Sequence, residues 1–331
     1  MRPRFSPILL LLAGAACVAP PSPPARTSDT EAVGRRDANR TVLPVNQVVT
    51  PAGRQVELPG LRPQALALSP DGRLLLTAGK TAELVVVDPD RGEVRQRVPL
   101  PKTTDPKAPS GNVLRPDKEG QISYTGLAFA PDGRRAFLSD VNGSVVAFDV
   151  AADGTLSVAR SFRLPDAGAP RRREEIPAGL AVSGDGRLLY VCGNLSNRLL
   201  EMDAADGRVL RTFAVGVAPY DVVLAGGRAW VSNWGGRRPA AGDLTGPAGR
   251  GTEVRVDPVK HVASEGSVSV VDLATGKVLA EVLTGLHASA LAVSPDGRHV
   301  PSANPASDTL RVIPARSPAA AETIPARATP A

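Results

Sequence analysis

Closely spaced aspartates are the first residues in this sequence whose types could do chemistry. They occur as three pairs: Asp88 with Asp90, Asp149 with Asp153, and Asp203 with Asp206. Two neighbouring carboxyl groups could act as general acid and general base. Each pair, however, stands at the same turn of a repeated segment, where an aspartate accepts hydrogen bonds from nearby backbone N–H groups. We therefore expect these pairs to shape turns and not to catalyse a reaction.

Six aromatic and polar residues form a second group of candidates. They are Tyr124, Tyr220, Asp221, Asn233, Trp234 and His287. Four precede short apolar runs in SYTGL, APYDV and LHASA, and the other two end the run in VSNWGG. Aromatic rings with a few polar groups suit a ligand-binding cavity. The same residues could also plug a channel structurally, and the sequence leaves both interpretations open.

Patterns typical of metal, nucleotide and nucleophilic catalysis are missing from the sequence. The three histidines, His261, His287 and His299, do not have the spacing of metal ligands. Val278 stands where a phosphate-binding loop needs Ser or Thr after Gly-Lys. The sequence also lacks G-x-S-x-G, H-E-x-x-H and C-x-x-C. We expect no metal, no cofactor and no catalytic residue, so a non-enzymatic role is favoured for this chain.

An internal repeat supplies the elements that position these residues. Copies of the pattern LALSPDGRLLLTAG begin at Leu66, Leu127, Leu180 and Leu291, and a shorter copy begins at Val222. Each copy joins two apolar runs through a turn containing Asp or Gly, which predicts a hairpin. Two further runs follow each hairpin, so the unit is a four-stranded blade. A β-sandwich has similar turn spacing, but the fixed order of runs and turns favours an all-β propeller.

The blades resemble those of the YVTN family of β-propeller repeats, and they lack the Gly-His and Trp-Asp marks of WD40 blades. The resemblance is clearest in LLYVCGNLSNRLLEMD and AWVSNWGG, and it extends over about residues 53–327. It implies a WD40-like propeller, usually of seven blades, of which about five are visible. The long insert before SVSVVD further resembles the N-terminal propeller of bacterial proteins whose YVTN blades precede an alkaline phosphatase-like phosphoesterase domain.

The first 40 residues differ in composition from the repeats. Residues 1–17 carry two arginines and a short apolar run, as a secretory signal does. The stretch GAAC resembles a bacterial lipobox in which Cys17 is lipidated, although glycine replaces the usual leucine. Ordinary cleavage near Ala16 is the alternative. Either way we expect a periplasmic or extracellular protein, with residues 18–40 as a Pro-rich tether to a membrane if Cys17 is acylated.

The propeller is expected to occupy residues 41–331. Its blades are predicted at about residues 62–101, 123–165, 177–216, 218–285 and 287–327. Residues 53–60 match fourth strands and should close the last blade, yet residues 321–324 resemble that blade's own fourth strand. We therefore expect an incomplete seven-bladed ring: an arc with a gap, or a ring in which residues 53–60 displace the last strand. Trp230 and Cys192 are expected in the core.

Insertions at residues 102–122, 166–176 and 235–266 fall on connections that emerge at one face, which also carries the six candidates. The chain has a net charge of +6, but these insertions carry only about +1, 0 and +1. With no run of exposed aromatics for base stacking, nucleic acid is not favoured as a partner.

We therefore expect a binding or accessory module of the bacterial envelope. It should be monomeric, bind an unknown small molecule or protein, and form the propeller part of a larger phosphoesterase-type protein without being catalytic itself. A lactonase-type enzyme is the alternative, because 6-phosphogluconolactonase propellers have similar blades, although only His287 and Arg62 suit such a site. A nucleic-acid-binding propeller is the lesser alternative.

Overall fold

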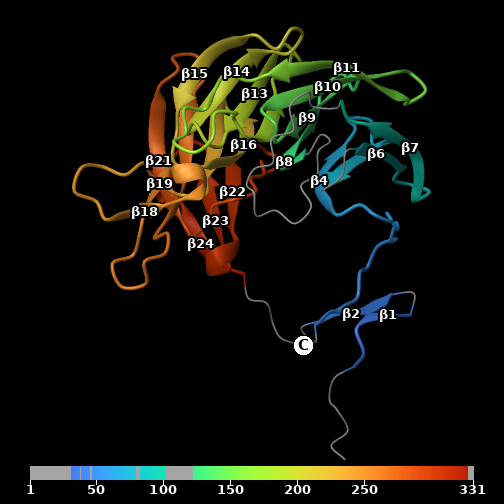
Figure 1. The fold of residues 1–331 in the computed structure, drawn as a ribbon, viewed down its shortest axis with the longest axis horizontal. Coiled ribbons are helices and arrows are strands. Elements are labelled where there is room, and N and C mark those ends of the chain that lie inside the picture. Colours follow the sequence, from blue (N-terminus) through green and yellow to red (C-terminus); the bar gives the residue numbers. More distant parts are fainter. Residues whose placement is uncertain (1–30, 38, 45–46, 80–82, 102–121, 327–331) are drawn as a thin grey trace, which may run out of the picture. The chain divides into compact units, whose positions relative to one another are not determined.

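The computed structural model describes residues 31–37, 39–44, 47–79, 83–101 and 122–326 (Figure 1). The chain divides into two compact units, Met1–Gln55 and Val56–Ala331. In the first unit, β1 (Gly34–Asp37), β2 (Arg40–Val42) and β3 (Val48–Val49) form a small antiparallel sheet. Residues 34–37 and Arg40, expected to belong to an extended tether, therefore contribute to strands. Cys17 and the predicted signal segment lie outside the described residues.

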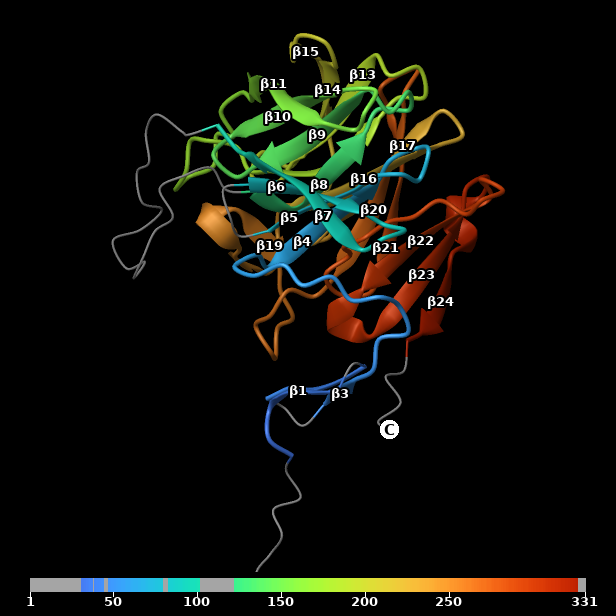
Figure 2. The same cartoon turned by 90° about the vertical axis from the view of Figure 1, so that its right-hand side faces the viewer.

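The second unit contains four four-stranded antiparallel sheets, which are the first four blades (Figures 1 and 2). Blade one consists of β4 (Pro63–Leu68), β5 (Leu75–Gly79), β6 (Glu83–Asp88) and β7 (Glu93–Pro99). Blade two consists of β8 (Ile122–Phe129), β9 (Arg135–Asp140), β10 (Ser144–Val150) and β11 (Leu156–Arg163). Blade three consists of β12 (Pro177–Val182), β13 (Leu188–Gly193), β14 (Arg198–Asp203) and β15 (Val209–Ala214). Blade four consists of β16 (Pro219–Ala225), β17 (Arg228–Asn233), β20 (Gly266–Asp272) and β21 (Val278–Thr284).

The fifth blade is a three-stranded sheet of β22 (His299–Asn304), β23 (Thr309–Pro314) and β24 (Glu322–Pro325). A single bridge between Leu291 and Ser302 stands where the other blades have their first strand. The first strands β4, β8, β12 and β16 contact one another in succession, so they occupy the inner edge of the arc. These sheets confirm the predicted all-β propeller fold.

Aspartate turns account for the repeated hairpins. In blade one the carboxylate of Asp71 accepts hydrogen bonds from the Ser69 hydroxyl at 2.6 Å and from the Arg73 N–H at 3.1 Å. The Ser69 hydroxyl mainly, with the Arg73 contacts, lowers the pKa of Asp71 to about 2. Gly72 follows with a φ of 74°, a conformation that side chains disfavour. Blades three and five repeat the arrangement with Asp185 and Asp296.

In each of the three predicted pairs at least one aspartate bonds to its own turn, and in the second pair Asp153 accepts the Thr155 N–H at 2.9 Å. Asp88 accepts hydrogen bonds from the backbone N–H groups of Asp90 and Arg91 at 3.0 and 2.9 Å. Asp203 accepts one from Ala205 and Asp206 one from Arg208. These carboxylates are therefore turn-forming groups.

Apolar side chains between successive blades form the core. One hydrophobic cluster joins blade one to blade two, a second joins two to three, a third joins three to four, and a fourth joins four to five. Trp230 and Cys192 are both fully buried in these clusters, which confirms their predicted place in the core. Among the residues that the structure describes, no hydrophobic cluster joins blade five to blade one.

The prediction that residues 53–60 form a closing fourth strand is wrong. This segment has no strand pairing in the structure, and β24 is the outer strand of blade five. Val56 and Leu58 instead pack against a cluster made by Leu61, Val85 and Val87 on blade one. The segment lacks a ladder because no three-stranded partner stands beside it among the described residues, and its apolar side chains cover part of the nearest sheet instead.

Candidate functional site

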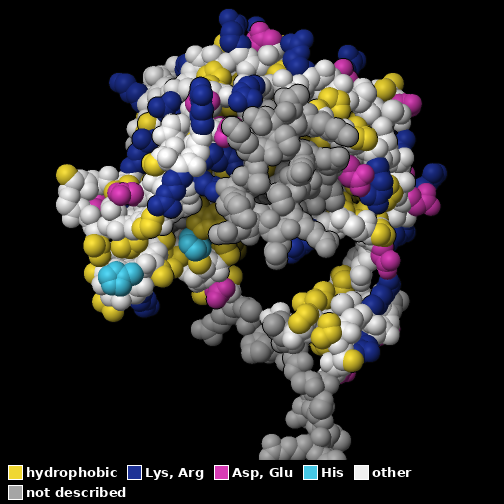
Figure 3. Space-filling view, viewed as in Figure 1, with side chains coloured by type: hydrophobic (Ala, Val, Ile, Leu, Met, Phe, Trp, Pro, Cys, Tyr) yellow, Lys and Arg dark blue, Asp and Glu magenta, His cyan; other side chains and the backbone are white. Residues whose placement is uncertain are grey.

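The face on which the blade connections carry insertions has a structured surface. The insertion in blade four contains β18 (Thr245–Pro247), the 3-10 helix η1 (Gly249–Gly251) and β19 (Glu253–Arg255). It contacts the insertion between blades two and three, because the Arg171 N–H donates to the Arg250 carbonyl at 3.1 Å. Figure 3 shows this insertion as a projecting lobe with exposed hydrophobic side chains, and Lys and Arg side chains spread over the rest of the visible face. Two of the three predicted insertions therefore share one face, and residues 102–121 lie outside the described part.

Ion pairs fix the blade-four insertion to its blade. Glu265 receives the Arg237 guanidinium at 2.8 Å and the Arg255 Nε at 3.5 Å. The other end of Arg255 reaches Asp243 at 2.7 Å. Arg238 donates to the backbone carbonyls of Val215, at 2.6 Å, and Asn197. These arginines therefore hold the insertion in place, and the charges of Arg237 and Arg255 are compensated by Glu265 and Asp243.

Three of the predicted residues meet at the junction of blades four and five. The Tyr220 and Trp234 rings lie 5.1 Å apart between centroids at 74°, and the Trp234 and His287 rings lie 5.2 Å apart at 58°. We call Tyr220, Trp234 and His287 the aromatic cluster. The Trp234 side chain is 38% exposed, whereas the other two are partly buried. Edge-to-face contacts of this kind hold aromatic rings in a fixed orientation.

The backbone explains why these rings converge. Tyr220 lies at the start of β16, where the preceding Pro219 pairs with Asn233 at the end of β17, so the next residue, Trp234, comes beside it. The Trp234 N–H then donates to the Ala218 carbonyl at 3.0 Å. His287 has a φ of 59° in the link to blade five, a conformation that turns the chain sharply. The cluster is therefore built from the first strand of blade four and the connections that follow its second and fourth strands.

Asp221 lies at the same junction but serves a different role. The equivalent position holds Ala or Gly in the other blades: Ala65, Gly126, Gly179 and Ala290. One Asp221 oxygen accepts the Leu291 N–H of blade five at 2.9 Å, and the other accepts the Val222 N–H at 2.8 Å. Burial raises the pKa of this carboxyl to about 6. Asp221 therefore connects blade four to blade five and titrates close to neutral pH.

Asn233 belongs to a buried polar cluster inside blade four. Its Nδ2 donates to the Ser269 hydroxyl at 2.8 Å, and lies 3.1 Å from both the Ser267 hydroxyl and the Glu281 carboxylate. Both serines donate to Glu281, whose pKa is raised by burial. The Asn233 Oδ1 has no hydrogen-bond partner in the described part of the chain. Asn233 is therefore buried inside blade four, where it cannot contact a ligand bound at the surface.

Sequence reasoning missed Glu281 and its two serines. The signal was available in SVSVVD, where serines alternate with valines on a strand and must share one face. Tyr124 lies in β8, but its side chain is outside what the structure describes. The structure therefore brings together Tyr220, Trp234 and His287, with Asp221 at the same blade junction and Asn233 in the interior.

The chemistry open to the aromatic cluster is binding by stacking and hydrogen bonding. Burial lowers the pKa of the His287 imidazole, so this ring is neutral at pH 7 and can both donate and accept. Within the described ranges no group of three or more His, Cys, Asp or Glu side chains is arranged to hold a metal ion. None of the helices found there has the length and hydropathy needed to cross a bilayer.

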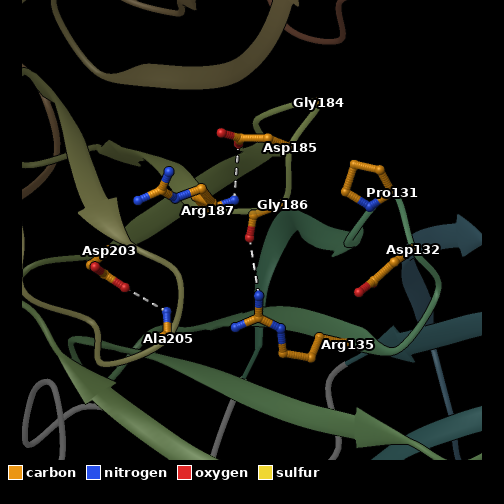
Figure 4. Close-up of a pocket in the computed structure, with 9 residues that line it drawn as sticks. All are labelled: Pro131, Asp132, Arg135, Gly184, Asp185, Gly186, Arg187, Asp203 and Ala205. Carbon is orange, nitrogen blue, oxygen red and sulfur yellow. Dashed lines mark hydrogen bonds between the residues drawn. The ribbon is translucent and has the colours of Figure 1, made fainter.

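Two hollows lie on the opposite face, where the aspartate turns emerge. A cavity of about 310 Å³ lies between blades two and three (Figure 4). There the Arg135 guanidinium points across to blade three and donates to the Gly186 and Ala204 carbonyls at 3.0 and 2.7 Å. A second hollow of about 640 Å³ lies between blades one and two. In these two hollows Arg95 and Arg135 donate to backbone carbonyls, and Arg73 forms an ion pair with Asp71.

Comparison with known proteins supports the fold and goes no further. No protein-family model matches the chain, and no curated protein matches its sequence. Kuenenia stuttgartiensis hydrazine synthase is similar in structure, with 16% identity and a TM-score of 0.53, over 82% of this chain and 68% of that one. U3-55K is similar with 11% identity and a TM-score of 0.54, over 80% of this chain and 64% of that one. The chain thus spans about two thirds of each protein.

Proposed function

We propose that this chain is an exported β-propeller binding module whose ligand contacts the aromatic cluster on the insertion face. The observation that carries the proposal is the packing of Tyr220, Trp234 and His287, which leaves the Trp234 indole 38% exposed on a rigid support. A large exposed aromatic side chain with little freedom to move is the kind of residue that anchors a partner. The neutral His287 adds hydrogen-bonding capacity beside it without adding charge.

The ligand that fits this surface has a flat or apolar face bordered by polar groups. Such a ligand stacks on the indole, while the surrounding backbone and the imidazole supply directional contacts. The cluster contains no formal charge at pH 7, which favours a neutral small molecule or a protein side chain over a nucleic acid. A nucleic-acid partner would need basic groups free to contact phosphates, whereas Arg237 and Arg255 are held by Glu265.

We further propose that the module is of YVTN type and works in the bacterial envelope with a phosphoesterase. The support is the sequence of its blades and of its long insert, together with the signal-like residues 1–17. Acylation at Cys17 would tether the module to a membrane, with the following Pro-rich residues as spacer. In this role the propeller binds and positions a substrate or partner, and the phosphoester chemistry is performed by another domain or protein.

Tryptophan fluorescence tests the binding site directly, because Trp230 is fully buried and Trp234 is 38% exposed. The chain is titrated with a panel of neutral saccharides, sugar phosphates and short peptides. We expect the active compound to change the emission of the wild type and not of Trp234→Phe, which keeps only Trp230. Binding measured by calorimetry should weaken by about 1–3 kcal/mol in Tyr220→Ala with Trp234→Ala.

The matched control changes the opposite face. A variant with Arg73→Ala, Arg134→Ala and Arg187→Ala alters the turns that border the two hollows. If this arginine variant loses binding while the aromatic variant keeps it, the ligand binds the opposite face and the proposal is wrong. Hydrolysis of a sugar lactone by the wild type would instead favour the lactonase alternative, and His287→Ala should then abolish it.

A further inference from the structure

The four junctions between successive blades repeat one apolar interface. On one side of each junction lies the first-strand residue of the later blade: Leu127, Leu180, Val222 or Leu291. These four side chains are 7%, 7%, 2% and 9% exposed. We call the side of a blade that carries this residue its leading face. Every leading face from blade two to blade five is thus covered by the blade before it.

The other side of each junction is formed by a cross-strand pair of the earlier blade. The pairs join the third strand to the fourth: Leu84 with Val98, Val145 with Phe162, Leu199 with Phe213, and Val268 with Val282. The third-strand members are all 0% exposed, and their fourth-strand partners are at most 8% exposed. We call this side the trailing face. A trailing face and a leading face together make one complete junction.

Blade one and blade five each present one half of this interface to solvent. On the leading face of blade one, Leu66 stands in the position of Leu127 and is 65% exposed, and Leu68 is 57% exposed. On the trailing face of blade five, the equivalent cross-strand pair is Leu310 with Ile324. These side chains are 38% and 47% exposed. Exposed apolar side chains at positions that are otherwise buried mark a surface that binds something.

We propose that the trailing face of blade five binds the leading face of blade one in a second copy of this chain. The two surfaces carry apolar side chains at the positions that form the interface the molecule already makes four times, so their apolar character matches. Because different surfaces meet, the contact is heterologous and can continue from copy to copy. In this proposal the chain is a monomer only at low protein concentration, and copies associate as the concentration rises.

The segment before blade one sets the extent of the contact. Val56 and Leu58 cover the outer part of the leading face at Val85 and Val87, and they leave the inner part around Leu66 open. The incoming blade therefore packs its innermost strand, β22, against Leu66 and Leu68, and its outer strands, with Leu310 and Ile324, against Val56 and Leu58. It meets the segment 56–61 at its outer edge. Because this contact between copies buries only part of the leading face, it is weaker than the junctions between blades of the same chain.

A pair of complementary variants tests the proposal. Leu66→Asp with Leu68→Asp damages only the leading face of blade one, and Leu310→Asp with Ile324→Asp damages only the trailing face of blade five. Leu210→Asp, at a 41% exposed leucine on the outer strand of blade three, is the matched control. Each chain is recovered from the periplasm of an expression host with Cys17→Ser to prevent acylation. Mass is then measured by light scattering over about 1–100 µM.

We expect the mass of the wild type and of Leu210→Asp to rise with concentration, while each double variant stays monomeric. An equimolar mixture of the two double variants should form dimers and nothing larger, because each keeps the face that the other lacks. A wild type that stays monomeric throughout overturns the proposal. Double variants that associate alone, or a mixture that stays monomeric, overturn it as well. If circular dichroism shows that an aspartate variant is unfolded, serine at the same positions replaces it.

Discussion

Replacing Asp221 by Asn should change how the stability of the propeller depends on pH. The Asp221 carboxylate joins blade four to blade five through the Leu291 N–H, at a position where other blades have Ala or Gly. Burial raises its pKa to about 6 from an ordinary value of 3.8. Asn keeps the shape of the side chain and removes the titration, so the two proteins isolate this one group.

The sign and the size follow from the pKa difference. Between about pH 4 and pH 6 the folded protein holds the Asp221 proton more tightly than the unfolded chain does, so stability from this group falls as pH rises. The full effect, from a pKa of about 6 against 3.8, is about 3 kcal/mol. Asn also loses one of two N–H contacts, which costs about 1–3 kcal/mol at every pH. The variant should therefore be less stable at pH 4 and about as stable as the wild type at pH 7.5.

Urea unfolding from pH 4 to pH 8 measures this difference. His287, whose lowered pKa makes stability rise with pH, and Glu281, whose raised pKa makes it fall, are present in both proteins and cancel in the comparison. We expect the free energy difference between the variant and the wild type to move by about 2–3 kcal/mol in favour of the variant as pH rises over this range. A difference that stays constant within about 0.5 kcal/mol would refute the raised pKa and the junction role.

Three further predictions concern other parts of the chain. In thermal unfolding, Gly207→Ala should destabilise the protein by about 1–3 kcal/mol more than Gly227→Ala. Both glycines have positive φ, but only a Cβ at Gly207 would meet a phenylalanine ring, at 2.3 Å. Glu201→Gln should cost about 2 kcal/mol in urea unfolding, because the buried carboxylate receives the Arg211 guanidinium. Radiolabelled palmitate should label the membrane-fraction wild type and not Cys17→Ser, and an unlabelled, cytoplasmic wild type would contradict both export and acylation.

Periodic features were predictable because each blade supplies an independent copy of the same signal. Hairpins, turn aspartates and buried third strands all follow from alternation and turn chemistry within about 40 residues. The buried positions of Trp230 and Cys192 follow from the same alternation. The convergence of Tyr220, Trp234 and His287 was predictable only in part, since strand direction gives the face but not the ring contacts.

The environments of single polar residues could not be predicted in the same way. Asp221 and Asn233 were both candidates for a ligand-binding cavity, with a structural plug as the alternative, because both lie near strand ends. The structure shows that Asp221 bonds to the next blade and that Asn233 bonds to the serines of its own blade. Which partner such a side chain finds depends on the neighbouring sheet, about 70 residues away for Leu291, and no local pattern contains that information.

Residues 53–60 show why a strand-like sequence does not by itself make a strand. Their pattern matches GRVLRTFAVG, which contains β15, yet they have no ladder in the structure. A strand exists only where another strand accepts and donates its backbone hydrogen bonds, whereas apolar side chains need only a surface. Val56 and Leu58 therefore pack on blade one without pairing, in the place where the blade before it would stand. Leu66 and Leu310 likewise need only an apolar surface to cover them, because they are exposed at positions that are buried in the internal junctions. In the proposed assembly a second copy provides that surface for each of them.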